Sequence, residues 1–208
     1  MMPRCLPAAY RASSFSLLLA AAGTALGGAA PGPLDTIRQG TEKVLSILRD
    51  PTLKAPEKKA ERRKAMVDGV DSFFNWPDMA QRSLGIHWPK RTDAEKKEFV
   101  ALYTELVRDT YLTKADNYSG EQVRYEGEKI EGDYARVSAQ IITTRNTEIP
   151  IVYSVKKFGD QWLIYDVAIE GVRLVNNYRT QFSSMLDGMS YAEFLRQLQA
   201  KVAGLKKE

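Results

Sequence analysis

The sequence is poor in the residues that bind metals or carry thiol chemistry. One cysteine, Cys5, and one histidine, His87, occur in 208 residues. Structural zinc sites need several cysteine or histidine ligands, so no such set is available. The nucleophile turn of hydrolases, the phosphate-binding glycine loop and the dinucleotide fingerprint are absent as well. A lone histidine without an evident nucleophile is a weak catalytic signal. We therefore expect no metal, no other cofactor and no catalytic residues.

The sequence also lacks a strong charge excess and a long apolar run. Lys and Arg number 30 against 26 Asp and Glu, a net charge of +4, which is too small to indicate nucleic-acid binding. The longest apolar run, residues 15–22, is shorter than the roughly 20 residues of a membrane-spanning helix. Hydrophobic residues make up 44% and charged residues 27%. These values are typical of a soluble globular protein, and the length favours one domain.

The first thirty residues have the pattern of a secretory signal peptide. Arg4 and Arg11 occur without any acid, the apolar run follows, and small residues fill positions 23–30. We expect cleavage near residue 27 or 30, leaving residues 31–208 as one domain with a net charge of +2. Cys5 precedes the apolar run, so it cannot be the acylated cysteine of a lipoprotein. A basic start with a short apolar run is the pattern of bacterial export, which predicts a periplasmic location.

Helical periodicity of apolar residues is found in the first and the last part of the mature chain. Apolar residues recur at helical spacing over residues 34–48, 57–74, 78–91, 92–111, 172–182 and 190–202. Thr92 with Glu95, and Ser190 with Glu193, are predicted to form capping boxes. In such a box the hydroxyl and the carboxylate each accept a hydrogen bond from a backbone N–H at the start of a helix.

The hydrophobic period changes from 3.6 to 2 after Gly120. Strands are expected over residues 122–126, 136–141, 149–155 and 162–169, separated by turns at 131–133, 145–147 and 159–160. Four strands with short turns predict an antiparallel meander with one apolar face. The expected fold class is therefore α+β, with helices packed on one face of a curved four-stranded antiparallel sheet.

Charged residues gather where the last strand meets the next helix. Asp166 and Glu170 lie close in sequence to Arg173 and Arg179, with Gly171 between them. A buried acid can serve as a general acid or base, but an ion pair that fixes the junction is the simpler interpretation. We treat Asp166, Glu170, Gly171 and Arg179 as structural.

Residues 162–182 closely resemble the signature of the MlaC family, the toluene-tolerance type periplasmic component of a bacterial phospholipid-transport system. The order is tryptophan, tyrosine-aspartate-valine, glutamate-glycine-valine, asparagine-tyrosine-arginine, and glutamine-phenylalanine. Residues 79–118 and the closing helix, with Gly188, Leu195 and Leu198, also follow the family pattern, so the resemblance covers about residues 34–205. The main departure is Arg173, where the family usually has serine.

The resemblance implies a soluble periplasmic carrier and not an enzyme, and we expect a monomer because a shuttle must dock with two partners in turn. Such a carrier would hold a glycerophospholipid by its acyl chains and pass it between an inner-membrane ABC transporter complex and an outer-membrane lipoprotein/porin complex. This activity would maintain the lipid asymmetry of the outer membrane. The fold would then enclose an apolar cavity between helices and sheet. We expect thirteen residues to line it: Phe99, Leu102, Tyr103, Leu106, Tyr111, Tyr125, Val137, Ile141, Ile151, Tyr153, Val172, Val175 and Tyr178.

Two other functions remain compatible with the same pattern. A periplasmic interaction or chaperone module would have a filled core and an exposed apolar patch for its partner. An isomerase or dehydratase on a cone-shaped α+β fold would need an acid and a base inside the pocket. The inward strand positions of this sequence are nearly all apolar, which counts against the enzyme.

Overall fold

The computed structural model describes residues 30–115 and 118–205, without the side chains of residues 113–115. The expected signal peptide therefore lies outside the described residues, apart from Ala30. The chain forms six α-helices, four short 3-10 helices and five strands within these ranges, and the predicted α+β class is confirmed. Their order is α1 (Pro33–Arg49), η1 (Pro51–Leu53), η2 (Pro56–Lys58), α2 (Lys59–Val70), η3 (Asp71–Phe73), α3 (Trp76–Leu84), η4 (Gly85–Lys90), α4 (Asp93–Ala115), β1 (Gln122–Glu131), β2 (Tyr134–Ile142), β3 (Glu148–Phe158), β4 (Gln161–Ile169), β5 (Val172–Arg173), α5 (Leu174–Gly188) and α6 (Tyr191–Leu205).

The strands form one antiparallel sheet in the order β1-β2-β3-β4-β5. The prediction of four strands was wrong because it missed the short fifth strand, β5. The helix that was predicted from residue 172 begins at Leu174. The physical reason is a tight reversal after β4, where Glu170 (φ +51°) and Gly171 (φ +79°) both adopt the left-handed region. The chain therefore turns back along β4 for two residues before the helix starts.

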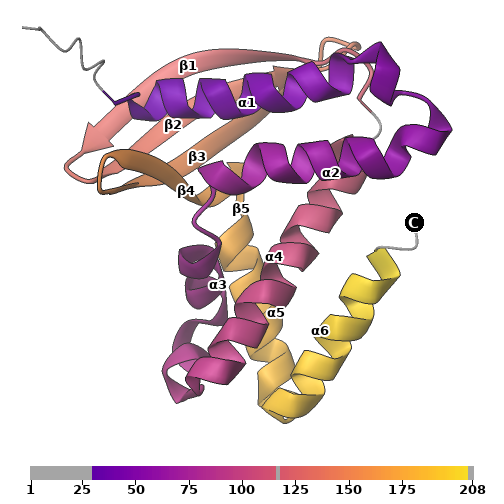
Figure 1. Cartoon of the computed structure of the whole chain (residues 1–208). Coiled ribbons are helices and arrows are strands. Elements are labelled where there is room, and N and C mark those ends of the chain that lie inside the picture. The colour runs from indigo at the N-terminus through magenta and orange to yellow at the C-terminus, as the bar shows by residue number, and fades with distance from the viewer. Residues whose placement is uncertain (1–29, 116–117, 206–208) are drawn as a thin grey trace, which may run out of the picture.

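The helices divide into two groups around the sheet. The long α1 lies along one face of the sheet with α2 beside it, whereas α3, α4, α5 and α6 form a bundle beyond the β4–β5 edge (Figure 1). Asn75, at the start of α3, donates its N–H to the carbonyl oxygen of Ile164 in β4 at 2.8 Å, which ties the bundle to the sheet. None of the described helices is both long and apolar enough to cross a membrane.

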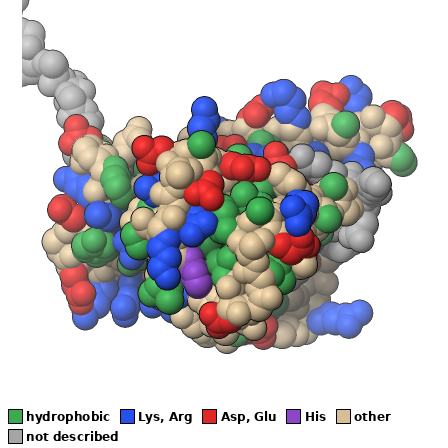
Figure 2. Space-filling model, turned by 90° about the horizontal axis from the view of Figure 1, so that it is seen from below, with side chains coloured by type: hydrophobic (Ala, Val, Ile, Leu, Met, Phe, Trp, Pro, Cys, Tyr) green, Lys and Arg blue, Asp and Glu red, His purple; other side chains and the backbone are tan. Residues whose placement is uncertain are grey.

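Two of the three apolar cores in the described part of the chain correspond to these two groups, and the third, formed by Leu48, Met66 and Leu112, joins α1, α2 and α4. The bundle core is formed by α3, α4, α5 and α6, and the sheet core lies between α1 and the strands. Phe74 and Tyr111 pack against both cores and join them. Viewed from the bundle end, hydrophobic side chains show in the middle of the face with charged side chains around them (Figure 2). Ile86 of η4 is 72% exposed.

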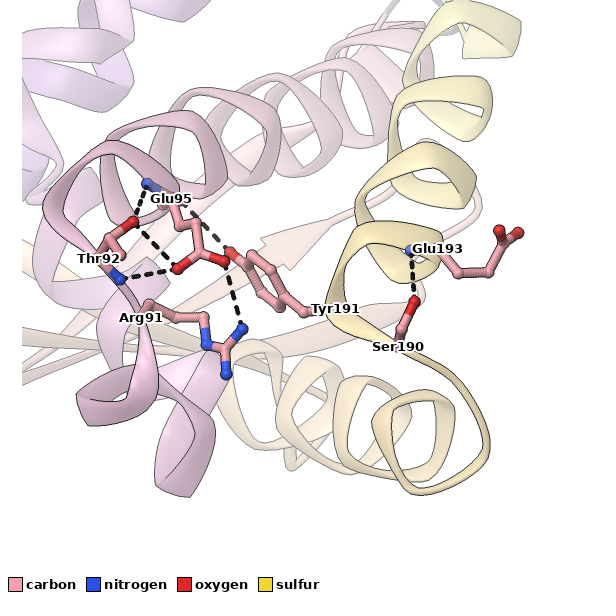
Figure 3. A network of polar contacts seen from close by, with 6 residues as sticks. All are labelled: Arg91, Thr92, Glu95, Ser190, Tyr191 and Glu193. Atoms are coloured by element: carbon pink, nitrogen blue, oxygen red, sulfur yellow. Dashed lines mark hydrogen bonds and ion pairs between the residues drawn. The ribbon is translucent and has the colours of Figure 1, made fainter.

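The capping box at the start of α4 is confirmed. The Thr92 N–H donates to Glu95 Oε2 at 2.7 Å, and the Glu95 N–H donates to Thr92 Oγ1 at 3.2 Å (Figure 3). These bonds satisfy two backbone donors that the helix itself leaves unpaired. They also hold the pKa of Glu95 below its usual value, chiefly through the Thr92 backbone hydrogen bond.

The second predicted box, at the start of α6, is half formed. The Glu193 N–H donates to Ser190 Oγ at 3.2 Å, but the Glu193 carboxylate pairs with Arg196 one turn further along. The box prediction is therefore wrong for the carboxylate. The neighbouring Tyr191 hydroxyl donates to the Glu95 carbonyl oxygen at 3.3 Å, so the starts of α4 and α6 are fastened together (Figure 3).

Candidate functional site

The sheet presents an apolar face to α1. Alternate residues of β2 and β3 point to this face because successive side chains of a strand point to opposite sides. Val137 and Val155 are 0% exposed, and Ile37 of α1, which packs in the same core, is 2% exposed. The helix α1 packs on this face, chiefly over β1 and β2.

The structure distributes the expected lining residues between the bundle core and the sheet core. The structure places Tyr125, Val137, Ile141, Ile151 and Tyr153 in or against the sheet core. Six others lie in or against the bundle core: Phe99, Leu102, Tyr103, Leu106, Val175 and Tyr178. Tyr111 touches both cores. Val172 lies apart from them in β5 and is 56% exposed.

The bundle core is filled by interlocking aromatic rings. Phe182 meets Phe99 edge-on at a centroid distance of 5.7 Å and Phe194 at 5.3 Å. Tyr103 is fixed at its polar end as well, because the Ser83 hydroxyl donates to the Tyr103 oxygen at 2.9 Å. Edge-to-face pairs and a buried hydrogen bond specify one arrangement of these side chains. The sheet side is therefore the better place for a ligand than the bundle.

Two tyrosines, Tyr125 and Tyr153, bring hydroxyl groups into the apolar sheet core. Burial raises the pKa of Tyr153 to about 12 and also raises the pKa of Tyr125. Interaction with the side chain of Thr41 of α1 lowers both pKa values, but by less than burial raises them. Both phenols thus stay neutral at physiological pH. In the described part of the chain the buried Tyr125 hydroxyl meets no partner in good hydrogen-bond geometry, and Thr41 of α1 is the side chain that interacts with it. Such a group costs about 1–3 kcal/mol unless something satisfies it.

Few polar contacts hold α1 on the sheet. The Leu34 N–H donates to Glu128 Oε2 of β1 at 2.6 Å, and the Arg38 guanidinium lies over the Tyr125 ring at 5.2 Å. Thr41 of α1 also interacts with Tyr125 and Tyr153, and Ile37 packs in the sheet core. The 3-10 turns η1 and η2 connect α1 to α2.

The junction between β4 and α5 is centred on Asp166, which is 2% exposed. Its carboxylate accepts the Val175 N–H at 3.1 Å and the Arg173 Nε–H at 2.7 Å. Arg179 donates instead to the Arg82 carbonyl oxygen at 2.8 Å, and Glu170 is exposed. The ion pair at this junction therefore joins Asp166 to Arg173, and the side chains of Glu170 and Arg179 lie outside it.

Two hollows open on the surface. One of about 140 Å³ is lined by Arg82, Tyr165, Asp166, Arg173, Val175, Asn176 and Arg179. The other, of about 220 Å³, is lined by Lys129, Glu131, Tyr134, Ala135, Arg136 and Tyr165. Both are polar and smaller than the roughly 300–1,000 Å³ of a drug-sized ligand pocket, so neither suits two acyl chains. Sequence reasoning missed both hollows because their residues come from distant segments. Among the described residues, no cluster of His, Cys, Asp and Glu could hold a metal ion.

Comparison with known proteins places the chain in a family. The family model described as "MlaC protein" matches residues 38–200, most of the sequence. The chain belongs to the MlaC family. The resemblance predicted from residues 162–182 is thereby confirmed.

Similar proteins match this MlaC-family chain over most of their length. A protein of Haemophilus influenzae, named intermembrane phospholipid transport system binding protein MlaC, is 23% identical over 151 residues, 70% of each chain. A solved structure from Ralstonia solanacearum, described as a phospholipid-binding protein in complex with a phospholipid, has a TM-score of 0.76 and 20% identity. It covers 85% of this chain and 99% of its own. The likeness shows that the two chains share a fold.

Proposed function

We propose that this MlaC-family protein is a periplasmic carrier of glycerophospholipid. It would move lipid between an inner-membrane ABC transporter complex and an outer-membrane lipoprotein/porin complex, and so support the lipid asymmetry of the outer membrane. The observation that carries the proposal is the apolar sheet face beneath the amphipathic helix α1. The names of the Haemophilus and Ralstonia relatives support it.

The acyl chains would lie between α1 and the sheet. In the structure α1 fills this space, so lipid entry requires α1 to move away from β1 and β2. Hydrocarbon chains then replace the side chains of α1 against Val137, Ile151 and Val155. Because one apolar contact replaces another, the exchange costs little free energy and is reversible.

A protein carrier is needed because the acyl chains are insoluble. Two chains of about 16 carbons, at roughly 0.8 kcal/mol per methylene, lose on the order of 25 kcal/mol when exposed to water. Transfer from a bilayer to an apolar site avoids most of this cost. The carrier therefore needs no fuel of its own, and the partner complexes set the direction of transport.

The Tyr125 hydroxyl, which loses Thr41 when α1 moves away, fits the ester region of such a lipid. It lies among apolar side chains and can donate a hydrogen bond. A glycerophospholipid carries ester carbonyl oxygens between its acyl chains and its head group. A bond from Tyr125 to such an oxygen would satisfy both partners and leave the head group at the edge of the site.

The test is a transfer assay between vesicles. Detergent-free protein is incubated with donor vesicles containing a labelled glycerophospholipid, separated from them, and mixed with acceptor vesicles. We expect the protein to take up and deliver the label. Failure to extract label from donors of any common phospholipid would exclude the carrier.

A filled core favours a second candidate, a periplasmic protein-interaction or chaperone module. The close ring packing of the bundle core and the 0% exposure of Val137 suit a protein whose interior is solid. This module would bind a protein through its surface and extract no lipid in the same assay. The exposed Ile86 at the bundle end would be part of its contact surface.

A further inference from the structure

Three arginines from three different elements converge at the start of α5. Arg82 belongs to α3, Arg173 to β5 and Arg179 to α5, and all three line the hollow of about 140 Å³. Contacts between α3 and α5 bring these segments together although Arg82 is 91 positions away from Arg173 in the sequence. The proposed lipid site uses none of them.

Each of these guanidinium groups is fixed through its Nε atom. Arg82 Nε lies 2.8 Å from Asp78 Oδ1, Arg173 Nε lies 2.7 Å from Asp166 Oδ2, and Arg179 Nε donates to the Arg82 carbonyl oxygen at 2.8 Å. In the described part of the chain, the terminal Nη groups of the three arginines make no hydrogen bond. A guanidinium held at Nε is preorganised, and its Nη donors match a carboxylate.

The hollow itself has an excess of positive charge. Asp166 is its only acidic lining residue, and that carboxylate is already engaged by Arg173 and the Val175 N–H. Three arginines stand against two carboxylates, Asp166 in the lining and Asp78 beside it on Arg82, which leaves a net charge of +1. The first turn of α5 adds the partial positive charge of a helix N-terminus.

Cations and aromatic rings extend this site across the sheet. The Arg82 guanidinium lies 4.5 Å from the Tyr165 ring centroid, Tyr165 meets Tyr134 edge-on at 6.0 Å, and Lys156 lies 5.3 Å from the Tyr134 centroid. Tyr165 lines both hollows, and Arg136 lines the second. We call the lining of the two hollows together with Lys156 the Tyr165 surface.

The Tyr165 surface faces away from α1. Ala135 and Val137 point into the sheet core, so Tyr134 and Arg136, which alternate with them along β2, point to the opposite side. A partner bound here would leave α1 free to move. Docking and lipid exchange can therefore occur together.

We propose that the Tyr165 surface is the docking site for an acidic segment of a partner protein. Carboxylates of that segment enter the hollow between Arg82, Arg173 and Arg179, and its apolar side chains rest on the rings of Tyr134 and Tyr165. The inference deepens the proposed function, on which it rests, because the expected partners are the membrane complexes that load and unload the carrier.

A protein segment fits this surface better than an anionic bilayer. Exposed acids Glu131, Asp133 and Asp160 occupy the two hairpin ends beside Tyr134, and the two ends are joined by a 2.8 Å bond from the Lys157 N–H to the Asp133 carbonyl oxygen. A flat anionic membrane would be repelled by these acids. A protein segment of matching shape can place its carboxylates in the hollows and keep them away from these exposed acids.

The experiment compares two double charge reversals of equal net charge. Arg136→Glu with Arg179→Glu changes the Tyr165 surface, whereas Lys54→Glu with Lys201→Glu changes exposed lysines elsewhere. Binding is measured to each of the two membrane complexes of the same bacterium, reconstituted in uncharged vesicles, and to protein-free vesicles containing phosphatidylglycerol. Native mass spectrometry and thermal melting record the lipid load and the folding of each variant.

We expect the wild type to bind at least one complex in a salt-sensitive way, and the Tyr165-surface variant to bind it at least about tenfold more weakly. The control should stay within about twofold of the wild type. Should the charge-reversed pair not fold, the neutral pair Arg136→Gln with Arg179→Gln should still weaken binding. The docking site would be overturned if variant and wild type bound equally well, or if the control lost as much binding as the variant. It would also be overturned if the wild type bound neither complex, or if the variant lost binding only to the anionic vesicles. Absence of lipid from the wild type would instead contradict the proposed carrier function, since the binding measurement is separate.

Discussion

Shortening Ile37 of α1 to alanine should loosen the closed arrangement and strengthen lipid binding. Ile37 is 2% exposed and packs in the sheet core against the strands. Ile→Ala removes three carbons from this contact, a transfer loss of about 2.4 kcal/mol at roughly 0.8 kcal/mol per carbon. Buried substitutions of this kind cost about 2–5 kcal/mol in all, and the remainder comes from the cavity that rigid neighbours cannot fill.

The transfer loss and the cavity cost act differently on the closed arrangement and on the lipid-bound arrangement. The transfer loss applies whether Ile37 touches the sheet or an acyl chain. The cavity cost, about 1–2 kcal/mol, applies only to the closed arrangement, because flexible acyl chains fill the gap. The variant should therefore bind lipid about 5- to 30-fold more tightly than the wild type while its lipid-free form melts at a lower temperature.

A matched variant in the bundle core separates this effect from general destabilisation. Leu198→Ala in α6 also shortens a buried aliphatic side chain. It should lower the melting temperature by a similar amount and leave lipid affinity unchanged. Competition with a fluorescent phospholipid measures the affinity, and differential scanning calorimetry measures the melting. Weaker lipid binding by Ile37→Ala, or the same affinity gain in Leu198→Ala, would refute the proposed movement of α1.

Three further predictions concern single positions. Asp166→Ala should lower stability by about 1–3 kcal/mol, because it leaves the buried Val175 N–H without an acceptor, whereas Asp166→Asn should cost less; equal denaturation midpoints for the two variants would contradict this. The capping bonds from Thr92 lower the pKa of Glu95, so their stabilisation is present above the unfolded pKa of about 4.3 and is lost as the pH falls through the folded pKa. Glu95→Gln should therefore show a shallower loss of melting temperature in acid, and an unchanged pH profile would exclude this contribution. Val137→Asp places a charge in the sheet core and should abolish lipid co-purification; a folded variant with a normal lipid load would show that the acyl chains lie elsewhere.

The helices and the main strands could be predicted because local patterns determine them. Periodicity alone indicates six helical segments and four strands, and the capping box at Thr92 marks the start of α4 to the residue. The two-residue β5 has no period of its own. Its formation depends on the left-handed pair Glu170 and Gly171, and a sequence pattern does not reveal a positive φ at a glutamate.

The candidate site was less accessible to sequence reasoning. An apolar residue that lines a ligand space has the same sequence pattern as one that fills a core, so the pattern predicts the same role for Phe99 and Val137 although they lie in different cores. The pattern also does not indicate that α1 would cover the sheet face. The arginine hollow could not be predicted, since contact between α3 and α5 creates it.

Native mass spectrometry of the mature protein, purified without detergent and followed by solvent extraction of its lipids, tests the central claim most directly. We predict a mass excess that equals an extractable glycerophospholipid and disappears after delipidation. A bare protein mass that stays unchanged after incubation with phospholipid vesicles would contradict the carrier function and favour the protein-interaction module.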